Sequence, residues 1–291
     1  MTTSLTDLAV PVAGGVLGGT VYTPDGASTV LAIHGITANS RSWAAVAREL
    51  PGVRVIAPDL RGRGASGTLP APYDFASHVA DLIAVLDDAG VESVVVVGHS
   101  MGAFVAAALA DRHPDRVSAL VLVDGGVPLP TVDDPAAALG PAMQRLSVEF
   151  PDRSAYRRFW QAHPALGPYW NDDLSDYVDH DLVGVEPHLR SSVNADAVLT
   201  NVVELDGRNG YREALAALPQ PIEFLRAPRG LFDEVPPLYP DERVGEIADL
   251  LRTDVVDVPD VNHYTIVLGP GAPIVAQAIG KAPTRKPEVG R

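Results

Sequence analysis

Short apolar runs alternate with segments of helical spacing along most of the chain. The apolar runs cover residues 29–33, 53–57, 93–97, 117–123, 222–226 and 254–258. Helical spacing lies between them, most clearly over residues 75–89. Strands that are apolar at every position are typical of a parallel sheet covered on both faces, so the pattern predicts an α/β fold.

The alternation of strand and helix breaks over residues 128–219, which show helical fragments but no clear strand. A long insertion between two strands of a parallel sheet indicates a separate cap. We therefore predict a core domain over 1–127 and 220–280, with a helical cap over 128–219. The proline-containing, basic end, 281–291, is predicted to be a disordered tail.

Composition narrows the function classes. The 37 acidic and 22 basic residues give a formal charge of −15, which argues against nucleic-acid or anionic-membrane partners and leaves a small-molecule substrate. The chain has no cysteine, no 18-residue apolar stretch and no Lys or Arg among its first 40 residues. We expect a cytoplasmic protein with no metal site and no cofactor. The oligomeric state is left open.

The strongest local signal is the segment Gly98-His99-Ser100-Met101-Gly102, which matches the nucleophile elbow G-x-S-x-G. A predicted buried strand leads into it and a predicted helix leads out. Ser100 would then lie at a helix N-terminus, where the helix dipole favours developing negative charge. The alternative is a glycine-rich turn with a capping serine, and the strand and helix on either side favour the nucleophile.

A serine nucleophile needs a base, and His263 follows the last predicted strand. Loops beyond the carboxyl ends of parallel strands line one crevice, so Ser100 and His263 are expected to meet there. Acyl transfer also needs oxyanion donors. We expect the backbone N–H groups of Met101 and Ile36, with Thr37 as the neighbouring possibility. His34, in the same loop as Ile36, is expected to be a structural hydrogen-bonding residue.

Residues 62–67 fit the dinucleotide pattern G-x-G-x-x-G and follow a predicted strand. In a dinucleotide fold this pattern opens a helix. Pro70 and Pro72 follow so closely that they oppose such a helix. Nucleotide binding is therefore rejected.

Together these segments resemble the α/β-hydrolase superfamily, in its capped serine hydrolase branch. The blocks that carry the resemblance are His34-Gly35 with Ser40 and Trp43, Asp59-Leu60-Arg61-Gly62-Arg63-Gly64 with Ser66, Gly98-His99-Ser100-Met101-Gly102, and His263. The resemblance implies an eight-stranded, mostly parallel sheet flanked by helices, and a triad in the order Ser, acid, His. It also implies that the 59–66 segment is a structural loop near the site. Ser100 argues against the dehalogenase and epoxide hydrolase branches, which use aspartate at the elbow.

The chain departs from the family pattern at the acid. Counting back from Val235-Pro236 selects Asp233, although about three extra residues separate it from the preceding strand. Asp124, at the end of an earlier strand, is the rival, because some relatives place the acid there. Glu234 is the third candidate.

The predicted function is a serine hydrolase that acts by Ser-His-Asp acyl transfer on a small to medium apolar ester or lactone. The ester preference is an analogy with this architecture. Thr37, Trp160 and Trp170 are the candidate pocket residues, the last two because the predicted cap lies over the site. Alternatives are a carbon–carbon bond hydrolase with the same triad, a lyase or cofactor-free oxygenase, and a ligand receptor without turnover.

Overall fold

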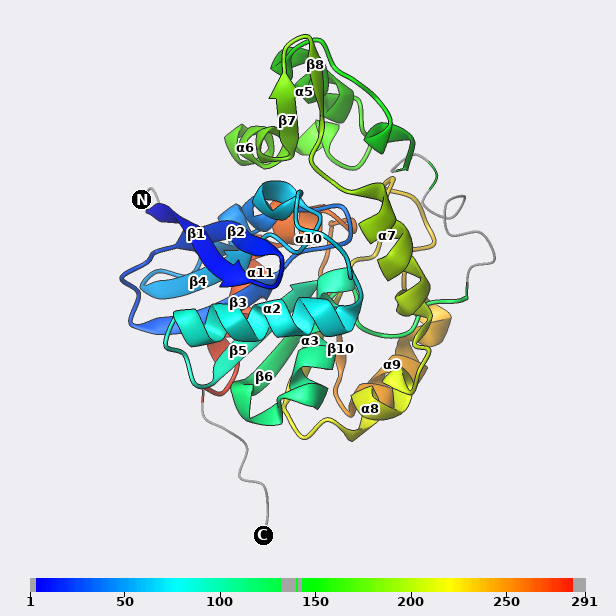
Figure 1. Cartoon of the computed structure of the whole chain (residues 1–291). Coiled ribbons are helices and arrows are strands. Elements are labelled where there is room, and N and C mark those ends of the chain that lie inside the picture. Colours follow the sequence, from blue (N-terminus) through cyan, green and yellow to red (C-terminus); the bar gives the residue numbers. More distant parts are fainter. Residues whose placement is uncertain (1–3, 132–139, 141–142, 285–291) are drawn as a thin grey trace.

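A central sheet of eight strands organises the computed structural model, which describes residues 4–131, 140 and 143–284 (Figure 1). The strands are β1 (Leu5–Val12), β2 (Gly15–Tyr22), β3 (Ser28–Ile33), β4 (Val53–Pro58), β5 (Val94–His99), β6 (Val117–Val123), β9 (Ile222–Arg226) and β10 (Val255–Asp257). Their order is β1-β2-β4-β3-β5-β6-β9-β10. Only β1–β2 and β2–β4 are antiparallel. The predicted eight-stranded, mostly parallel sheet is confirmed.

Helices cover both faces of this sheet. They include α1 (Ala44–Arg48), α2 (Phe75–Asp88), α3 (Met101–Arg112), α8 (Tyr211–Ala217), α9 (Val244–Leu251), α10 (Thr265–Leu268) and α11 (Ala272–Lys281). Alternate strand residues enter two separate apolar cores. Val95 and Val97 belong to the core with α1 and α11, whereas Val94 and Val96 belong to the core with α2, α3 and α9. Burial on both faces explains why these strands are apolar at every position.

The strand order reverses between β3 and β5. The chain passes from β3 to β4 on one side and then crosses to β5 on the other side of β3. In open α/β sheets the ligand crevice lies outside the carboxyl ends of the strands at such a reversal. The loops that begin at His34, after β3, and at Ser100, after β5, flank this point.

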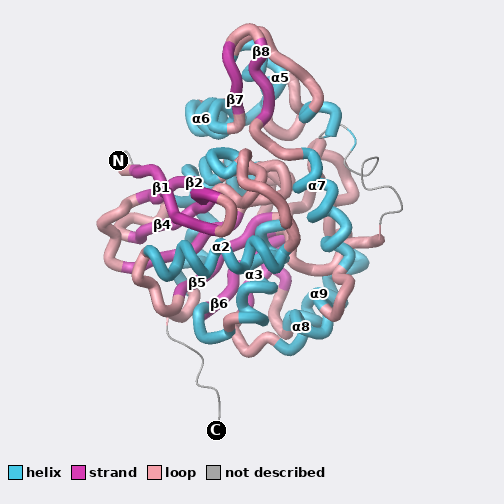
Figure 2. The backbone as a smooth tube through the Cα atoms, viewed as in Figure 1, coloured by secondary structure: helices cyan, strands magenta, loops and turns pink. Residues whose placement is uncertain are grey.

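A small unit projects from one edge of the core (Figures 1 and 2). It contains α5 (Arg153–Gln161), α6 (Asp172–His180), β7 (Leu182–Val185) and β8 (His188–Ser191). The antiparallel β7–β8 hairpin corrects the expectation of a purely helical cap. Both strands are only four residues long, and Gly184 at φ +109° interrupts the first, so the sequence offers little strand signal.

Charged residues on one face of α6 dock this unit on the core. The pairs are Arg48–Asp173 (2.6 Å), Arg41–Asp176 (3.4 Å) and His180–Asp59 (2.7 Å). The three α6 residues are spaced i, i+3 and i+7, which places them along one side of the helix.

The part of the predicted cap from residue 194 onward packs against the core. The N–H of Asn194, just before α7 (Ala195–Val202), donates to the Gly62 carbonyl at 2.8 Å. The Tyr211 hydroxyl at the start of α8 donates to the Gly126 carbonyl at 2.7 Å. The predicted boundary at residue 219 stays a prediction. Of the predicted tail, Lys281 ends α11, and residues 285–291 lie outside the described part.

Candidate active site

Ser100 lies at a sharp turn between β5 and α3. Its backbone has φ 54° and ψ −124°, a strained conformation for a residue with a side chain. Small residues must flank such a turn. A Cβ on Gly98 would lie 2.3 Å from the Gly102 carbonyl oxygen, and one on Gly102 would lie 2.1 Å from the Ile33 carbonyl oxygen. The sequence motif therefore has the local geometry of a nucleophile elbow.

His263 lies in the loop between β10 and α10 and is almost completely buried. Its Nδ1 is 2.7 Å from Oδ2 of Asp124. A carboxylate only accepts hydrogen bonds, so Nδ1 carries the hydrogen, and in the neutral imidazole the lone pair is on Nε2. The ring packs against His99, the residue before Ser100, with centroids 4.8 Å apart. Within the described residues, neither Nε2 of His263 nor the Ser100 hydroxyl has a hydrogen-bond partner.

The carboxylate that contacts His263 is Asp124, and not Asp233, the preferred candidate. Asp124 follows β6, is fully buried, and also accepts a bond from the Ala227 N–H at 3.1 Å. Asp233 instead accepts from Nε of Arg229 at 2.7 Å and from Nδ2 of Asn262 at 2.9 Å.

The long loop after β9 explains this difference. Its extra residues allow the carboxylates of the loop to pair with cations and N–H groups of the same loop. Asp233 pairs with Arg229 four positions earlier, and Glu234 accepts from the Phe232 N–H at 2.6 Å. Counting residues from the Val-Pro pair therefore finds Asp233 but not the carboxylate that contacts the histidine.

Asn262 is a site residue that the sequence analysis missed. It is fully buried directly before His263, and its Oδ1 accepts from the N–H groups of Tyr264 and Thr265, both at 3.0 Å. Its Nδ2 donates to Asp233 and, at 3.0 Å, to the Ala165 carbonyl of the projecting unit. Asn262 therefore fixes the turn that presents His263, and its only sequence signal is its place beside the histidine.

The loop after β3 approaches Ser100 closely. A Cβ on Gly35 would lie 3.3 Å from Cβ of Ser100, so glycine allows this approach. His34 holds the loop from behind, because its Nδ1 donates to the Gly35 carbonyl at 2.7 Å and its Nε2 accepts from the Leu60 N–H at 2.9 Å. Burial lowers the pKa of His34 to about 4, so it is neutral at pH 7. The expected structural role of His34 is confirmed.

The two expected oxyanion donors flank this approach. The N–H of Met101 is the first of α3, and the N–H of Ile36 belongs to the peptide whose carbonyl faces His34. Within the described residues neither N–H donates to a protein acceptor. Thr37, the neighbouring candidate, is half-buried in the same loop.

The predicted pocket aromatics lie in different surroundings. Trp160 is 5% exposed and packs inside the projecting unit, with its ring 6.4 Å from Tyr156 and 6.5 Å from Tyr177. Trp170 is half-buried at the edge of the apolar core. The structure places Trp160 in the cap's own core.

Three aromatic residues that the sequence analysis did not select connect the cap to His263. His163 stacks on Phe232 at 5.2 Å and meets Tyr264 edge-on at 5.6 Å, and Tyr264 lies 5.7 Å from His263. Burial, with a smaller contribution from the charge of Arg145, lowers the pKa of His163.

The segment after β4 is linked by hydrogen bonds to the loop after β3 and to α6. Asp59 is fully buried and accepts from the N–H groups of Ser40 at 2.6 Å and Ala65 at 2.9 Å. It also pairs with His180 of α6. Burial opposes ionisation of Asp59, but the hydrogen bond and charge of His180, together with His34 and the Ser40 N–H, hold the pKa below its ordinary value. The segment is structural, as the family resemblance implies.

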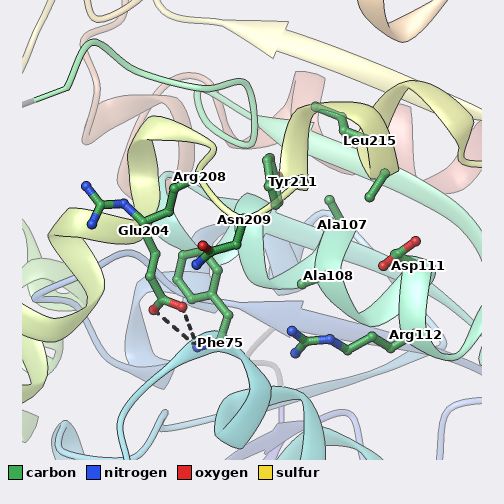
Figure 3. Close-up of a pocket in the computed structure, with 12 residues that line it drawn as sticks. Phe75, Ala107, Ala108, Asp111, Arg112, Glu204, Arg208, Asn209, Tyr211 and Leu215 are labelled. Carbon is green, nitrogen blue, oxygen red and sulfur yellow. Dashed lines mark hydrogen bonds between the residues drawn. The ribbon is translucent and has the colours of Figure 1, made fainter.

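A cavity of about 170 Å³ lies away from these residues, between the start of α2, the last turns of α3 and the start of α8 (Figure 3). Apolar side chains such as Phe75, Ala107 and Leu215 line part of it, and the charged residues Glu204 and Arg112 also line it. Its lining includes neither a nucleophile–base pair nor an oxyanion donor. This cavity is therefore separate from Ser100 and His263.

Comparison with known proteins agrees with this fold. A family model for the alpha/beta hydrolase fold matches residues 28–218. Lipase LipV of Mycobacterium tuberculosis is 47% identical over 108 residues, which cover 37% of this chain and 41% of that protein. Epoxide hydrolase 2 of Siraitia grosvenorii is 42% identical over 96 residues, covering 32% of this chain and 30% of that protein. Matches to these curated relatives thus span less than half of their length.

Solved structures match along nearly the whole chain. E-2-(acetamidomethylene)succinate hydrolase has a TM-score of 0.78 at 21% identity, covering 96% of this chain and 99% of that chain. A thioesterase domain from the curacin biosynthetic pathway has a TM-score of 0.76 at 24% identity, covering 96% of this chain and 100% of that chain. The chain belongs to the α/β-hydrolase fold family. Among the described residues, none of the helices is long and apolar enough to span a membrane.

Proposed function

We propose that this protein is a serine hydrolase with Ser100 as nucleophile, His263 as general base and Asp124 as the triad acid. The observation that carries the proposal is a strained elbow serine at the end of β5, with the buried acid of an Asp124–His263 pair at the end of the adjacent strand β6. The N–H of Ser100 donates to the Val123 carbonyl at 2.9 Å, so the elbow and Asp124 share one rigid sheet edge. Such preorganisation is what acyl transfer requires.

The proposed reaction has two steps. Nε2 of His263 takes the Ser100 proton as Oγ attacks the substrate carbonyl, and the N–H groups of Ile36 and Met101 hold the resulting oxyanion. His263 then protonates the leaving alkoxide, which departs and leaves an acyl-serine. Water attacks that ester, His263 accepts its proton, and the carboxylic acid is released as Ser100 is reprotonated. Asp124 keeps the Nδ1–H tautomer and stabilises the imidazolium.

The proposed substrate is a small to medium apolar carboxylic ester or lactone. The partial match to a protein named lipase supports the ester class. The aromatic group formed by His163, Phe232 and Tyr264 offers apolar surface beside His263. Cleavage of a carbon–carbon bond uses the same three residues and is distinguished by the substrate panel below.

A fluorophosphonate probe followed by peptide mapping tests the nucleophile. We expect one label, on Ser100, and none in Ser100→Ala. Turnover is then measured on a short-chain aryl ester, a lactone and a dienone. Labelling elsewhere would overturn the assignment of Ser100. Labelling of Ser100 with turnover of the dienone alone would favour the carbon–carbon hydrolase, and labelling without any turnover would favour a ligand receptor.

A further inference from the structure

Arg63 is a buried cation that forms no ion pair with any carboxylate in the described chain. Its side chain is fully buried in the loop after β4. The other buried arginines are paired: Arg61 lies 2.7 Å from Asp81, Arg145 contacts Asp181 at 2.5 Å, and Arg226 contacts Asp257 at 2.5 Å. Burial lowers the pKa of Arg63 to about 9, so the guanidinium is still charged at neutral pH. Burying an unpaired charge costs several kcal/mol, as a rule.

The guanidinium of Arg63 holds three neutral acceptors instead. Nε donates to the Ile36 carbonyl at 2.9 Å, one terminal nitrogen to the Arg61 carbonyl at 2.9 Å, and the other to Oδ1 of Asn201 at 2.8 Å. Asn201 belongs to α7, far along the chain. One buried cation thus ties the loop after β3 to the helix that returns from the cap.

The contact with Ile36 lies at the proposed oxyanion site. Peptide units are planar and trans, so holding a carbonyl also sets the direction of the N–H across the same peptide bond. His34 holds the Gly35 carbonyl and thereby the Ile36 N–H, and Arg63 holds the Ile36 carbonyl and thereby the Thr37 N–H. Both candidate donors of this loop are therefore fixed by buried side chains.

The charge of Arg63 faces neutral groups. Burial lowers the pKa of His34 to about 4 and that of His78 to about 3, and the positive charge of Arg63 contributes to both shifts. The substrate oxyanion of the proposed reaction would add a negative charge beside this loop. Within a buried site such a charge acts strongly because little solvent screens it.

We propose that Arg63 is a positioning residue of the oxyanion site, which fixes the Ile36–Thr37 peptide and places an unneutralised positive charge behind it. This inference rests on the proposed serine hydrolase function. An apolar residue of similar volume often replaces a buried ion without loss of stability, so a buried, unpaired arginine favours a catalytic reason for its presence.

The test compares Arg63→Gln and Arg63→Lys with the matched variants Arg61→Gln and Arg61→Lys. Both arginines are buried in one loop, but Arg61 is neutralised by Asp81 and does not contact the loop after β3. The kcat and KM on an aryl ester are measured per active serine, counted with a fluorophosphonate. Inhibition by a trifluoromethyl ketone, which forms a tetrahedral anion on serine, is measured in parallel.

We expect kcat of Arg63→Gln to fall about 10- to 100-fold, less than the 10²- to 10³-fold loss typical of removing an oxyanion donor itself. Arg63→Lys, which keeps the charge, should lose less. KM should change less than about threefold, and affinity for the ketone should fall in proportion to kcat, because the effect belongs to the anionic transition state. The Arg61 variants should keep kcat per active serine.

Equal losses in the Arg61 and Arg63 variants, or an Arg63→Gln enzyme with kcat within twofold of wild type, would overturn the proposal. If Arg63→Gln does not fold, Arg63→Lys decides, since a lysine keeps the charge but cannot hold three acceptors in this geometry. An Arg63→Lys enzyme with kcat within twofold of wild type would then overturn the proposal. Wild-type protein that neither reacts with the fluorophosphonate nor hydrolyses the ester would instead refute the proposed function. That failure is therefore distinct from failure of the Arg63 inference.

Discussion

The strand ends of the core and the loops around the cap hold their charged residues in different ways. Asp124 follows β6 directly, is fully buried, and contacts His263 and the Ala227 N–H. Asp233 lies in the long loop after β9, with 37% of its side chain exposed, and pairs with Arg229 of its own loop. A strand end has one direction fixed by the sheet, whereas a loop can turn its carboxylate toward the nearest cation. Position on the sheet is therefore the better guide to the carboxylate that contacts His263.

Replacing each carboxylate in turn is the most direct test of this difference. Asp124→Asn should keep the fold and lower kcat by about 10⁴-fold, because the amide stabilises the wrong imidazole tautomer and carries no charge. Asp233→Asn should cost less than about tenfold, since it acts only through Asn262. Steady-state kinetics on an aryl ester check both. The opposite ranking would show that the loop carboxylate is the triad acid.

The sequence predicted the core because both faces of its strands are buried. Val94 to Val97 are apolar at every position for this reason, and the elbow glycines are required by close contacts around Ser100. Ser100 and His263 were predictable because each follows a strand of the same sheet.

The remaining site residues had no comparable local signal. Asp233 matches a family spacing, whereas Asp124 has only its strand-end position. The role of Arg63 depends on Asn201, 138 positions away in the sequence, and the role of Asn262 on Ala165 of the cap. These contacts are set by tertiary packing and cannot be read from spacing.

The stability of a Trp160 variant tests whether this side chain belongs to the cap's own core. Trp160→Ala should lower the free energy of unfolding by about 3–5 kcal/mol, as is usual when a buried tryptophan is truncated. Phe159→Ala, a neighbouring aromatic that is 40% exposed, should cost distinctly less. Urea unfolding measures both. A changed ranking of ester substrates with unchanged stability would instead support Trp160 as a substrate-pocket residue, as the sequence analysis predicted.

The core beneath the site should be sensitive to acid. Burial and the charge of Arg63 lower the pKa of His78 to about 3, so the unfolded chain takes up a proton below about pH 6.5 that the folded protein does not. This contribution to stability is fully present above pH 6.5 and is lost as the pH falls towards 3. At pH 5 the loss amounts to about 2 kcal/mol.

Replacing His78 by Asn removes this titration. The free energy of unfolding, measured with urea at pH 7, 6 and 5, should fall less steeply for His78→Asn than for wild type. Parallel curves for the two proteins would show that His78 takes up its proton equally in both states.

The smallest expected effect has the opposite pH dependence and lies at the cap. His180 is packed against Asp59, with Arg41, Asp176 and His34 nearby. Burial lowers its pKa, but the hydrogen bond and charge of Asp59 outweigh burial, so the pKa is raised. A raised pKa means that the stabilising contribution is present below about pH 6.5 and is lost as the pH rises through the folded value.

His180→Gln should therefore be less stable than wild type at pH 6, by about 1 kcal/mol for a half-buried pair, and nearly equal to it at pH 9. Thermal unfolding at both pH values measures this, with Arg48→Gln as a control, because the Arg48–Asp173 pair docks the same helix without a titrating histidine. A His180→Gln deficit that persists at pH 9 would mean that the cap is held there by packing and uncharged hydrogen bonds, and the contrast with the acid-sensitive core would then disappear.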